Sequence, residues 1–455
     1  MRIGGRRPSA GVADDRLVRA ARNAVFAVFF GNGFLFASWA ARIPQVRAEL
    51  QITPGVLGLI LLFLAAGSTL GTPLSGLIVS WLGETRTVVI MSLAAAAGMA
   101  LAAVGTELGI PLVAAGLFVF GFGSGTWDVA MNVQGAAVEQ ELGRAILPRF
   151  HAAWSIGTVT GAGLGAAMVA LSVPVPVHLL AVAAFVAVAV PAAARSFLPA
   201  HRSPAPASPA RGSPAEARPA GASPAGASPA EASPAQASRA QPGRQTSRWR
   251  SALAAWTEPR TLLIGLFVLC MAFTEGTGND WLSLGVIDGY HTEAALGTLT
   301  FAVFLAAMTA GRWFGPRLID AYGRVPVLRS CAAVALAGLL LIEFGRVLPA
   351  AVAGAILLGL GTSLGFPVGL SSAADDPRYA ATRVSTAASI GYLAFLAGPP
   401  AVGFLADQVG VLRSLSVAGI LLIAAFFLCR VTAPLRPAPS PPPPGGPPPS
   451  EVIRC

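Results

Sequence analysis

The sequence predicts an all-α membrane protein with twelve transmembrane helices arranged as two six-helix bundles. Three observations support this prediction. Of the 455 residues, 54% are hydrophobic and only 11% are charged, whereas soluble domains carry about 25% charged residues. Apolar runs of roughly 20 residues, long enough to cross a ~30 Å hydrocarbon layer, recur along the chain. In addition, the second half of the sequence repeats features of the first.

Charged residues and breaks containing Pro or Gly divide the apolar sequence into twelve predicted spans. Six of them form an N-terminal bundle over residues 23–198, and six form a C-terminal bundle over residues 261–431. The predicted spans are 23–42, 56–80, 87–105, 110–137, 148–171, 177–198, 261–285, 295–316, 327–346, 350–373, 381–406 and 410–431.

Three polar segments lie outside the predicted bundles: an N-terminal tail of residues 1–22, a linker of residues 199–260 and a Pro-rich C-terminal tail of residues 432–455. In the linker, Ser-Pro-Ala recurs at five-residue spacing between Ser203 and Ser233. Such a sequence lacks the apolar residues that form a core, so we expect the linker and the C-terminal tail to be extended and disordered. A partner-binding linker is the alternative.

The arginines indicate the orientation. All 31 basic residues are Arg, and 26 of them fall on one side of the predicted membrane. The other side holds Arg42, Arg47, Arg346 and Arg413, while Arg312 lies within a span. By the positive-inside rule, both termini are expected in the cytoplasm, with the protein in the plasma (inner) membrane. A cleaved signal peptide is the alternative interpretation of the basic N-terminus, but its removal would leave an odd number of spans.

The same counts exclude several functions. The net charge of +10 is explained by orientation and contact with the lipid bilayer, so no nucleic-acid partner is expected. Without Lys, the sequence has neither a P-loop lysine nor a Schiff-base lysine. The four Cys are scattered and fit neither a disulfide framework nor a zinc site. No nucleophile–base set is visible, so we expect no enzymatic activity, no cofactor and no metal.

The two halves repeat each other at an offset of roughly 240 residues. FLAAGSTLG beginning at Phe63 matches FLAAMTAGR beginning at Phe304, and Trp39 parallels Trp281. Parallel six-helix repeats place a substrate site at their mutual interface. The repeat therefore predicts a central site between the bundles.

Two short motifs lie between spans two and three and between spans eight and nine. They are compared with the pattern G-x-x-x-D-x-x-G-R. In the first copy Ser80 replaces the Asp and the basic residue is displaced to Arg86, whereas the second copy keeps D-x-x-G-R. The residues that match are Gly76, Gly83, Arg86, Asp320, Gly323 and Arg324. On these motifs the sequence resembles the major facilitator superfamily, which implies the major facilitator fold. The resemblance implies that these residues form a cytoplasmic gating motif; topology anchoring is the alternative for each Arg.

Four longer phrases resemble the MosC-like permeases, a branch similar to the fucose permeases. They are GTWDVAMNVQ at Gly125, RFHAAWSIG at Arg149, EGTGNDW at Glu275 and GFPVGLSSAADDP at Gly365. The resemblance covers nearly the whole sequence apart from the linker and tails. It implies a transporter without defining its substrate.

Polar side chains inside the predicted spans are the candidates for that site. An ionisable group within a span costs about 2.5–3.5 kcal/mol, so its presence indicates a function by default. The candidates for substrate binding and proton coupling are Asp128, Asn132, His151, Glu275, Asn279, Asp280, Trp281 and Arg312. The alternatives are a static pair between Arg312 and one acid, helix packing for His151, and anchoring at the membrane interface for Trp281.

From these features we expect a secondary active transporter of a small polar organic solute, possibly sugar-like, that works by alternating access as a monomer. A partly desolvated carboxylate exchanges protons near neutral pH, so protons are the expected second partner. Antiporters of the superfamily carry a Pro beside the glycines of span five, which this sequence lacks, so the resemblance favours symport. The alternatives are proton-coupled efflux by antiport and, in another class, a non-transporting membrane sensor or scaffold.

Overall fold

A computed structural model describes residues 10–143, 146–199, 255–376 and 379–435, and these residues form helices and turns without any strand. Twelve segments among them are long and apolar enough to cross a membrane. The all-α fold with twelve spans is thereby confirmed. The Ser-Pro-Ala repeats of the linker and the Pro-rich part of the C-terminal tail lie outside the described residues.

The N half, up to residue 199, contains six spanning helices and one short helix. They are α1 (Ala10–Ala40), α2 (Ile43–Leu50), α3 (Pro54–Leu82), α4 (Glu84–Leu108), α5 (Ile110–Leu142), α6 (Leu147–Ala170) and α7 (Val175–Ala194). Helix α1 starts well before the predicted span at residue 23, and α5 continues beyond residue 137. The apolar run marks only the membrane-embedded part of a helix, whereas polar residues such as Arg16 and Glu141 extend the same helix.

The C half, from residue 255, has the same plan with two interruptions. Its helices are α9 (Pro259–Tyr290), α10 (Ala294–Tyr322), α11 (Arg324–Phe344), α12 (Leu348–Thr362), α13 (Gly365–Ala373), α14 (Ala380–Val409), α15 (Val411–Ser414), α16 (Ser416–Leu428) and the 3-10 helix η4 (Cys429–Thr432). The tenth predicted span is broken between α12 and α13, at Ser363 and Leu364. The twelfth is built from α15, α16 and η4.

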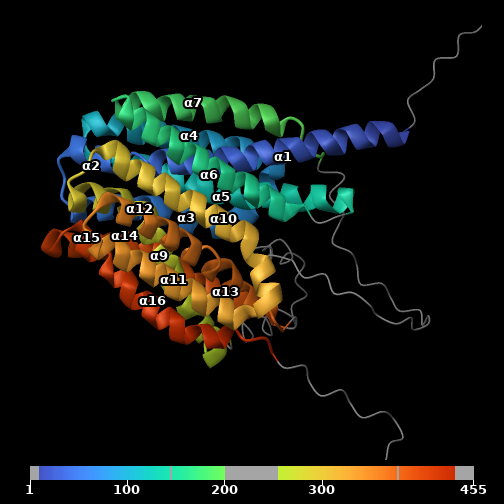
Figure 1. Ribbon diagram of the computed structural model, residues 1–455. Coiled ribbons are helices and arrows are strands. Elements are labelled where there is room, and N and C mark those ends of the chain that lie inside the picture. The colour runs from blue at the N-terminus through green and yellow to red at the C-terminus, as the bar shows by residue number, and fades with distance from the viewer. Residues whose placement is uncertain (1–9, 144–145, 200–254, 377–378, 436–455) are drawn as a thin grey trace, which may run out of the picture.

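The bundle has two ends, which we name by what they contain. The linker end holds the α3–α4 turn at Gly83, the α10–α11 turn at Gly323 and the last residues of α7. The far end holds α2, the start of α3 and the end of α14 (Figure 1). Figure 1 shows α2 and α15 at the left, and α13 toward the right. Successive spans run in opposite directions, so successive turns between them lie alternately at the linker end and at the far end.

Glycines bring neighbouring helices into close contact within each half. A Cβ on Gly98 of α4 would lie 2.3 Å from the backbone nitrogen of Phe120 on α5. In the C half, a Cβ on Gly338 of α11 would lie 2.5 Å from the carbonyl oxygen of Gly354 on α12. Small residues of this kind allow backbones to approach where lipid provides no hydrophobic drive for association.

The two halves meet along two pairs of helices. Helix α3 packs against α14, and α6 packs against α10. The predicted interface between two six-helix repeats therefore exists, and it is lined by helices from both halves.

Candidate functional site

An ion pair lies at the centre of the C half. The Nη2 of Arg312 on α10 lies 2.7 Å from Oε1 of Glu275 on α9, and Glu275 is buried. The Nε of Arg312 also donates a hydrogen bond, 3.3 Å long, to the carbonyl oxygen of Ser363. This carbonyl lies at the break between α12 and α13, where the helix leaves a backbone acceptor free. Arg312 therefore links three elements of the C half.

Two other carboxylates of the predicted site have no ion-pair partner among the described residues. Asp128 on α5 and Asp280 on α9 are both partly exposed. Asp128 lies within electrostatic range of Tyr392 on α14, across the boundary between the halves. The amide of Asn132 is bound to the backbone of Asp128, because its Nδ2 donates to the Asp128 carbonyl oxygen at 3.0 Å.

His151 also faces the opposite half. It lies on α6, within range of the charge of Arg312, and its ring meets that of Phe29 edge-on at a centroid distance of 5.2 Å. Its Nε2 is buried and has no hydrogen-bond partner among the described residues. We refer to Asp128, His151, Glu275, Asp280 and Arg312 together as the central site.

A polar network beside His151 was not predicted from the sequence. The indole Nε1 of Trp154 donates to Oδ1 of Asn32 at 3.0 Å, and Nδ2 of Asn32 donates to Oγ of Ser124 at 3.3 Å. The three side chains come from α6, α1 and α5. A signal was present, because Trp154 belongs to the RFHAAWSIG phrase and Asn32 is a lone amide in an apolar run. Only the packing of the three helices reveals their contact.

Trp281, which we predicted as a site residue, is fully buried. A Cβ on Gly403 of α14 would lie 3.1 Å from the Trp281 ring and 2.5 Å from the carbonyl oxygen of Pro54. Trp281 therefore packs beneath the contact between α14 and α3 and presents no surface to a solute in this conformation. Its counterpart Trp39 is equally buried. The neighbouring Asn279 has a buried Oδ1 that accepts no hydrogen bond from any described residue.

Three aromatic residues that the sequence did not single out lie near the central site. Phe366 on α13 lies 6.0 Å from Tyr392 and 6.2 Å from Phe395, both on α14, measured between ring centroids. Tyr392 is 41% exposed. We call these three residues the aromatic wall.

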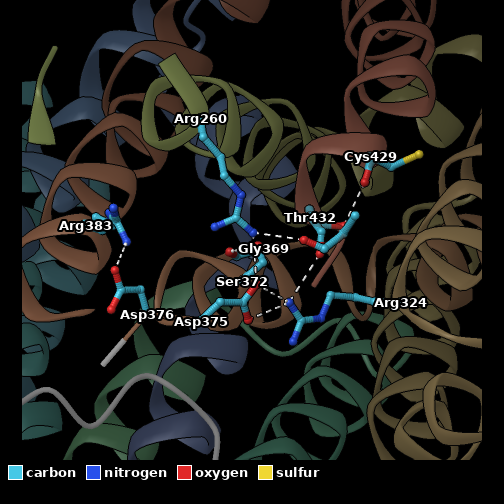
Figure 2. Close-up of polar contacts among 10 residues, drawn as sticks. Arg260, Arg324, Gly369, Ser372, Asp375, Asp376, Arg383, Cys429 and Thr432 are labelled. Carbon is cyan, nitrogen blue, oxygen red and sulfur yellow. Dashed lines mark hydrogen bonds and ion pairs between the residues drawn. The ribbon is translucent and has the colours of Figure 1, made fainter. Parts of the chain in front are cut away.

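In the gating motif of the C half, Arg324 takes part in a network of ion pairs (Figure 2). Arg324 binds Asp375, with Nη1 2.9 Å from Oδ1, and Nη2 of Arg260 lies 2.9 Å from Oδ2 of the same carboxylate. The two arginines also donate to the carbonyl oxygens of Thr432 and Ala433. Asp320 is instead exposed and has no ion-pair partner among the described residues.

A third arginine, Arg383, forms ion pairs at the same end. The Nε of Arg383 lies 2.6 Å from Oε2 of Glu258, and its Nη1 lies 3.1 Å from Oδ2 of Asp376. Asp375 and Asp376 belong to the GFPVGLSSAADDP phrase. This phrase was noted in the sequence, but the pairing of its carboxylates with these arginines was not predicted. Together these contacts join the start of α9, the start of α11, the end of α13 and the end of the last span.

The N half lacks such a network among its described residues. Gly83 has the expected positive φ of 74° at the α3–α4 turn, but Arg86 is exposed without an ion pair, and Gly76 lies within α3. The carboxylate of Glu139 caps α6 instead, because its Oε2 accepts hydrogen bonds from the backbone N–H groups of Ile146 and Leu147 at 2.6 and 2.8 Å. Such capping satisfies donors at a helix N-terminus.

Polar contacts between the halves lie at the far end. Nη1 of Arg47 on α2 lies 2.6 Å from Oδ2 of Asp288 on α9. The carboxylate of Asp407, at the end of α14, accepts from the backbone N–H of Gly55 at 3.0 Å and from the Thr53 hydroxyl at 3.3 Å. Among the described residues, these are all the hydrogen bonds and ion pairs that cross between the halves.

The sequence matches a family model and several relatives. Residues 24–315 and 281–454 match the model of the Major Facilitator Superfamily. The transporter y4wD of Sinorhizobium fredii is 30% identical over 387 residues, which cover 84% of this chain and 90% of that protein. The membrane protein MosC of Rhizobium meliloti is 26% identical, over 90% of this chain and 89% of its own length.

Solved structures show the same fold. The nucleoside transporter NupG superposes with a TM-score of 0.67 at 13% identity, covering 90% of this chain and 98% of that chain. The fucose:proton symporter FucP of E. coli superposes with a TM-score of 0.58 at 16% identity, covering 91% and 98%. At these identities the likeness extends to the fold alone.

Proposed function

The chain belongs to the Major Facilitator Superfamily and is a membrane transporter of that type, and we propose that it carries a small polar organic solute by alternating access as a secondary active transporter. The observation that carries this proposal is the position of the central site between halves whose crossing hydrogen bonds, among the described residues, lie only at the far end. Alternating access requires such a site and a closure on one side of it.

The distribution of Arg supports an orientation in which the linker end faces the cytoplasm. Of the arginines within the described residues, most lie at the linker end, including those that bind Asp375, and few lie at the far end. Under the positive-inside rule this end is cytoplasmic. The far-end contacts would then close the outer side, which corresponds to an inward-facing state in the plasma membrane.

Proton coupling is supported by the charges of the central site. Asp280 and Asp128 have no ion-pair partner among the described residues, and Glu275 shares its charge with Arg312. A carboxylate whose surroundings change as the halves move binds its proton with different affinity in the two states. Protonation of Glu275 would also release Arg312 to donate to a solute. Symport of solute with protons follows if both bind before the halves move.

A sugar-like solute fits the mixture of donors and acceptors. Arg312 donates, Asp128 and Asp280 accept, and Asn132 has a buried, unpartnered oxygen. Such a set matches hydroxyl groups, which both donate and accept. FucP is a fucose:proton symporter by name, and this supports the same class. Efflux by proton antiport would use the same groups and is the second candidate. A sensor or scaffold would not explain why ionisable side chains are kept within the membrane spans, where each one costs free energy.

The test is flux into proteoliposomes that contain the purified full-length protein. Radiolabelled L-fucose and uridine serve as first probes, followed by a wider panel of sugars and nucleosides, each with and without a pH gradient. We expect accumulation of at least one solute that collapses when a protonophore is added. Flux that ignores the pH gradient would refute proton coupling, whereas accumulation only under the opposite gradient would indicate antiport. Absence of flux with retained binding would favour a sensor.

A further inference from the structure

The aromatic wall is built beside the ion pair of the central site. Gly276 follows Glu275 directly, and a Cβ on it would lie 3.2 Å from Cδ1 of Phe395. On the other side, Arg312 holds the carbonyl oxygen of Ser363, three residues before Phe366. The aromatic wall and the Arg312–Glu275 pair are therefore adjacent, so a solute that contacts one lies close to the other.

Tyr392 lies on the side of α14 that packs against α3, because it precedes Pro399 and Gly403 by about two and three helical turns, and both of these residues contact α3. Its side chain is 41% exposed, yet it lies within electrostatic range of Asp128 on α5. Its hydroxyl has no hydrogen-bond partner among the described residues. An aromatic ring that is open on one face, packed on Phe366 at 6.0 Å and opposed by a carboxylate is suited to hold a ligand between the two.

An aromatic face combined with carboxylates suits a particular class of solute. A sugar ring, as a monosaccharide or in a nucleoside, stacks its apolar face on an aromatic ring while its hydroxyls bind polar groups at the edge. An acyclic polyol has the same hydroxyls but no preformed flat face. An organic cation also suits aromatic rings and carboxylates. The hydrogen-bond donors of Arg312, which is already paired with Glu275, are groups that a hydroxylated solute uses and a quaternary ammonium ion does not, and choline in the test below separates the two classes.

We propose that the aromatic wall of Phe366, Tyr392 and Phe395 stacks on the ring of the solute, and that Tyr392 determines the preference for cyclic over acyclic solutes. This inference rests on the proposed function, because it assigns a subsite within the transport site. It also explains why the fully buried Trp281 is not needed as a stacking residue.

The experiment measures binding to the purified full-length protein, so that it does not depend on flux. The thermal shift is recorded with L-fucose, uridine, the acyclic polyol mannitol and the organic cation choline. We expect a cyclic probe to raise the melting temperature and mannitol and choline to have no effect. Tyr392→Ala should weaken binding by about tenfold, as expected for loss of one stacking contact, while Tyr392→Phe retains it. Leu393→Ala, at the exposed neighbouring position, is the matched control.

Four outcomes would overturn the inference: equal binding of mannitol, binding of choline alone, no shift with either cyclic probe, or unchanged affinity in Tyr392→Ala. Binding that depends on Tyr392 in a protein without flux would support the aromatic wall and refute transport. The inference and the proposed function therefore fail separately. The melting temperature without ligand reports whether each variant is folded.

A second, independent observation concerns the far end. The corners at Gly83, Gly323 and Gly410 have nearly the same backbone conformation, with φ/ψ of 74°/164°, 83°/161° and 86°/156°. Each glycine ends one helix and begins the next, in a positive-φ region that other residues rarely adopt. The third corner carries the sequence Gly403-x-x-x-Asp407-x-x-Gly410. It has all three residues of the pattern G-x-x-x-D-x-x-G and lies at the opposite end of the bundle from the other two corners.

In this corner the carboxylate reaches across to the other half. Asp407 accepts from the N–H of Gly55 and from the Thr53 hydroxyl, at the N-terminus of the 29-residue helix α3. The partial positive charge at a helix N-terminus favours a carboxylate there. A Cβ on Gly55 would lie only 2.3 Å from Oδ2 of Asp407, so the approach depends on glycine. The geometry points to Asp407 as the latch that closes the far end and must release in each transport cycle.

The latch is tested without a solute, by spin-label distances across the far end. Labels are placed at Ala48 and His291, both exposed, in a protein without its native cysteines. Asp407→Ala should raise the ratio of long to short distances by about tenfold, as expected for a charge-assisted contact. Gly55→Ala should act in the same direction. Asp320→Ala is the matched control. Asp320 stands three residues before Gly323, as Asp407 stands before Gly410, but it has no ion-pair partner among the described residues, so its loss should leave the distances unchanged. Unchanged distances in both far-end variants, or an equal change in Asp320→Ala, would refute the latch.

Discussion

Glu275 differs from the other carboxylates of the central site because a guanidinium lies 2.7 Å from it. In a partly dehydrated site, removing one partner of such a pair leaves an uncompensated charge. Asp128 and Asp280 have no such partner among the described residues. In the proposed cycle, these two carboxylates would bind a proton or a hydrogen-bond donor of the solute without first breaking an ion pair. The three carboxylates therefore have different roles in the proposed cycle, although they are of one chemical type.

Replacing the titratable carboxylates one at a time tests coupling. Glu275→Gln or Asp280→Asn should abolish accumulation driven by a pH gradient but retain some exchange of solute, because shape is preserved and the proton site is lost. Flux in proteoliposomes with and without the gradient measures both quantities. If both variants still accumulate solute, the coupling residue is Asp128 or His151 instead. Asp320→Asn, which changes an exposed carboxylate outside the central site, serves as the control.

The Trp154–Asn32 contact makes a separate prediction about stability. Asn32→Ala leaves the part-buried indole N–H of Trp154 without its acceptor, and we expect the free energy of unfolding to fall by about 1 kcal/mol. Trp154→Phe removes the donor itself. Thermal or denaturant unfolding of the two single variants and the double variant forms a cycle. The double variant should lose less than the sum of the single losses; strictly additive losses would show that the hydrogen bond contributes nothing.

The elements at the linker end of the C half are joined through one carboxylate. Asp375, after α13, binds Arg260 at the start of α9 and Arg324 at the start of α11. A rigid-body movement of the C half preserves these contacts, whereas a movement of α13 against α11 breaks them. The network therefore favours movement of the C half as a unit, with the break between α12 and α13 as the place for internal adjustment.

Arg324 and Asp320 should consequently behave differently, although both belong to the same sequence motif. Arg324→Ala removes the link between α11 and the Asp375 loop and should slow exchange more than it weakens equilibrium binding. Asp320→Ala should have little effect on either, because the carboxylate is exposed and has no ion pair among the described residues. Exchange rates and ligand affinity, measured on the same preparations, separate the two effects. A large loss of affinity with normal exchange in Arg324→Ala would contradict the assignment.

Across the whole protein, the halves are held together by packing of α3 on α14 and of α6 on α10. The covalent connection between α7 and α9 is a long sequence dominated by Ser, Pro and Ala, a composition without the apolar residues of a core. Assembly of the two halves should therefore depend on their interface and not on the connecting sequence.

Deleting residues 203–238 tests this expectation. The variant should insert correctly and transport at nearly the wild-type rate, because a spacer of this composition contributes only its length. Membrane insertion, melting temperature and flux are compared with those of the full-length protein. A second variant with the same segment scrambled controls for length. Loss of activity in both variants with intact folding would identify the segment as a partner-binding site.

The twelve spans, the two repeats, the family and all five residues that we group as the central site can be recognised in the sequence alone. The hydrocarbon layer imposes a minimum apolar length on every span and a cost on every charge within it. Both constraints act on each span separately, so their effects can be recognised in the linear sequence. Glu275, Asp280 and Arg312 were recognised in this way.

Which of these residues meet is settled only when the helices pack. Packing of the helices pairs Arg324 with Asp375, whereas Asp320 of the same motif forms no ion pair among the described residues. Packing also buries Trp281 beneath Gly403. It also brings Asn32 to Trp154 and Asp407 to Gly55, across separations of 122 and 352 residues. Hydropathy specifies that a residue lies in the membrane but not which neighbour it faces. That choice depends on helix rotation and on close backbone contacts at glycines, which are properties of the assembled bundle and not of any single span.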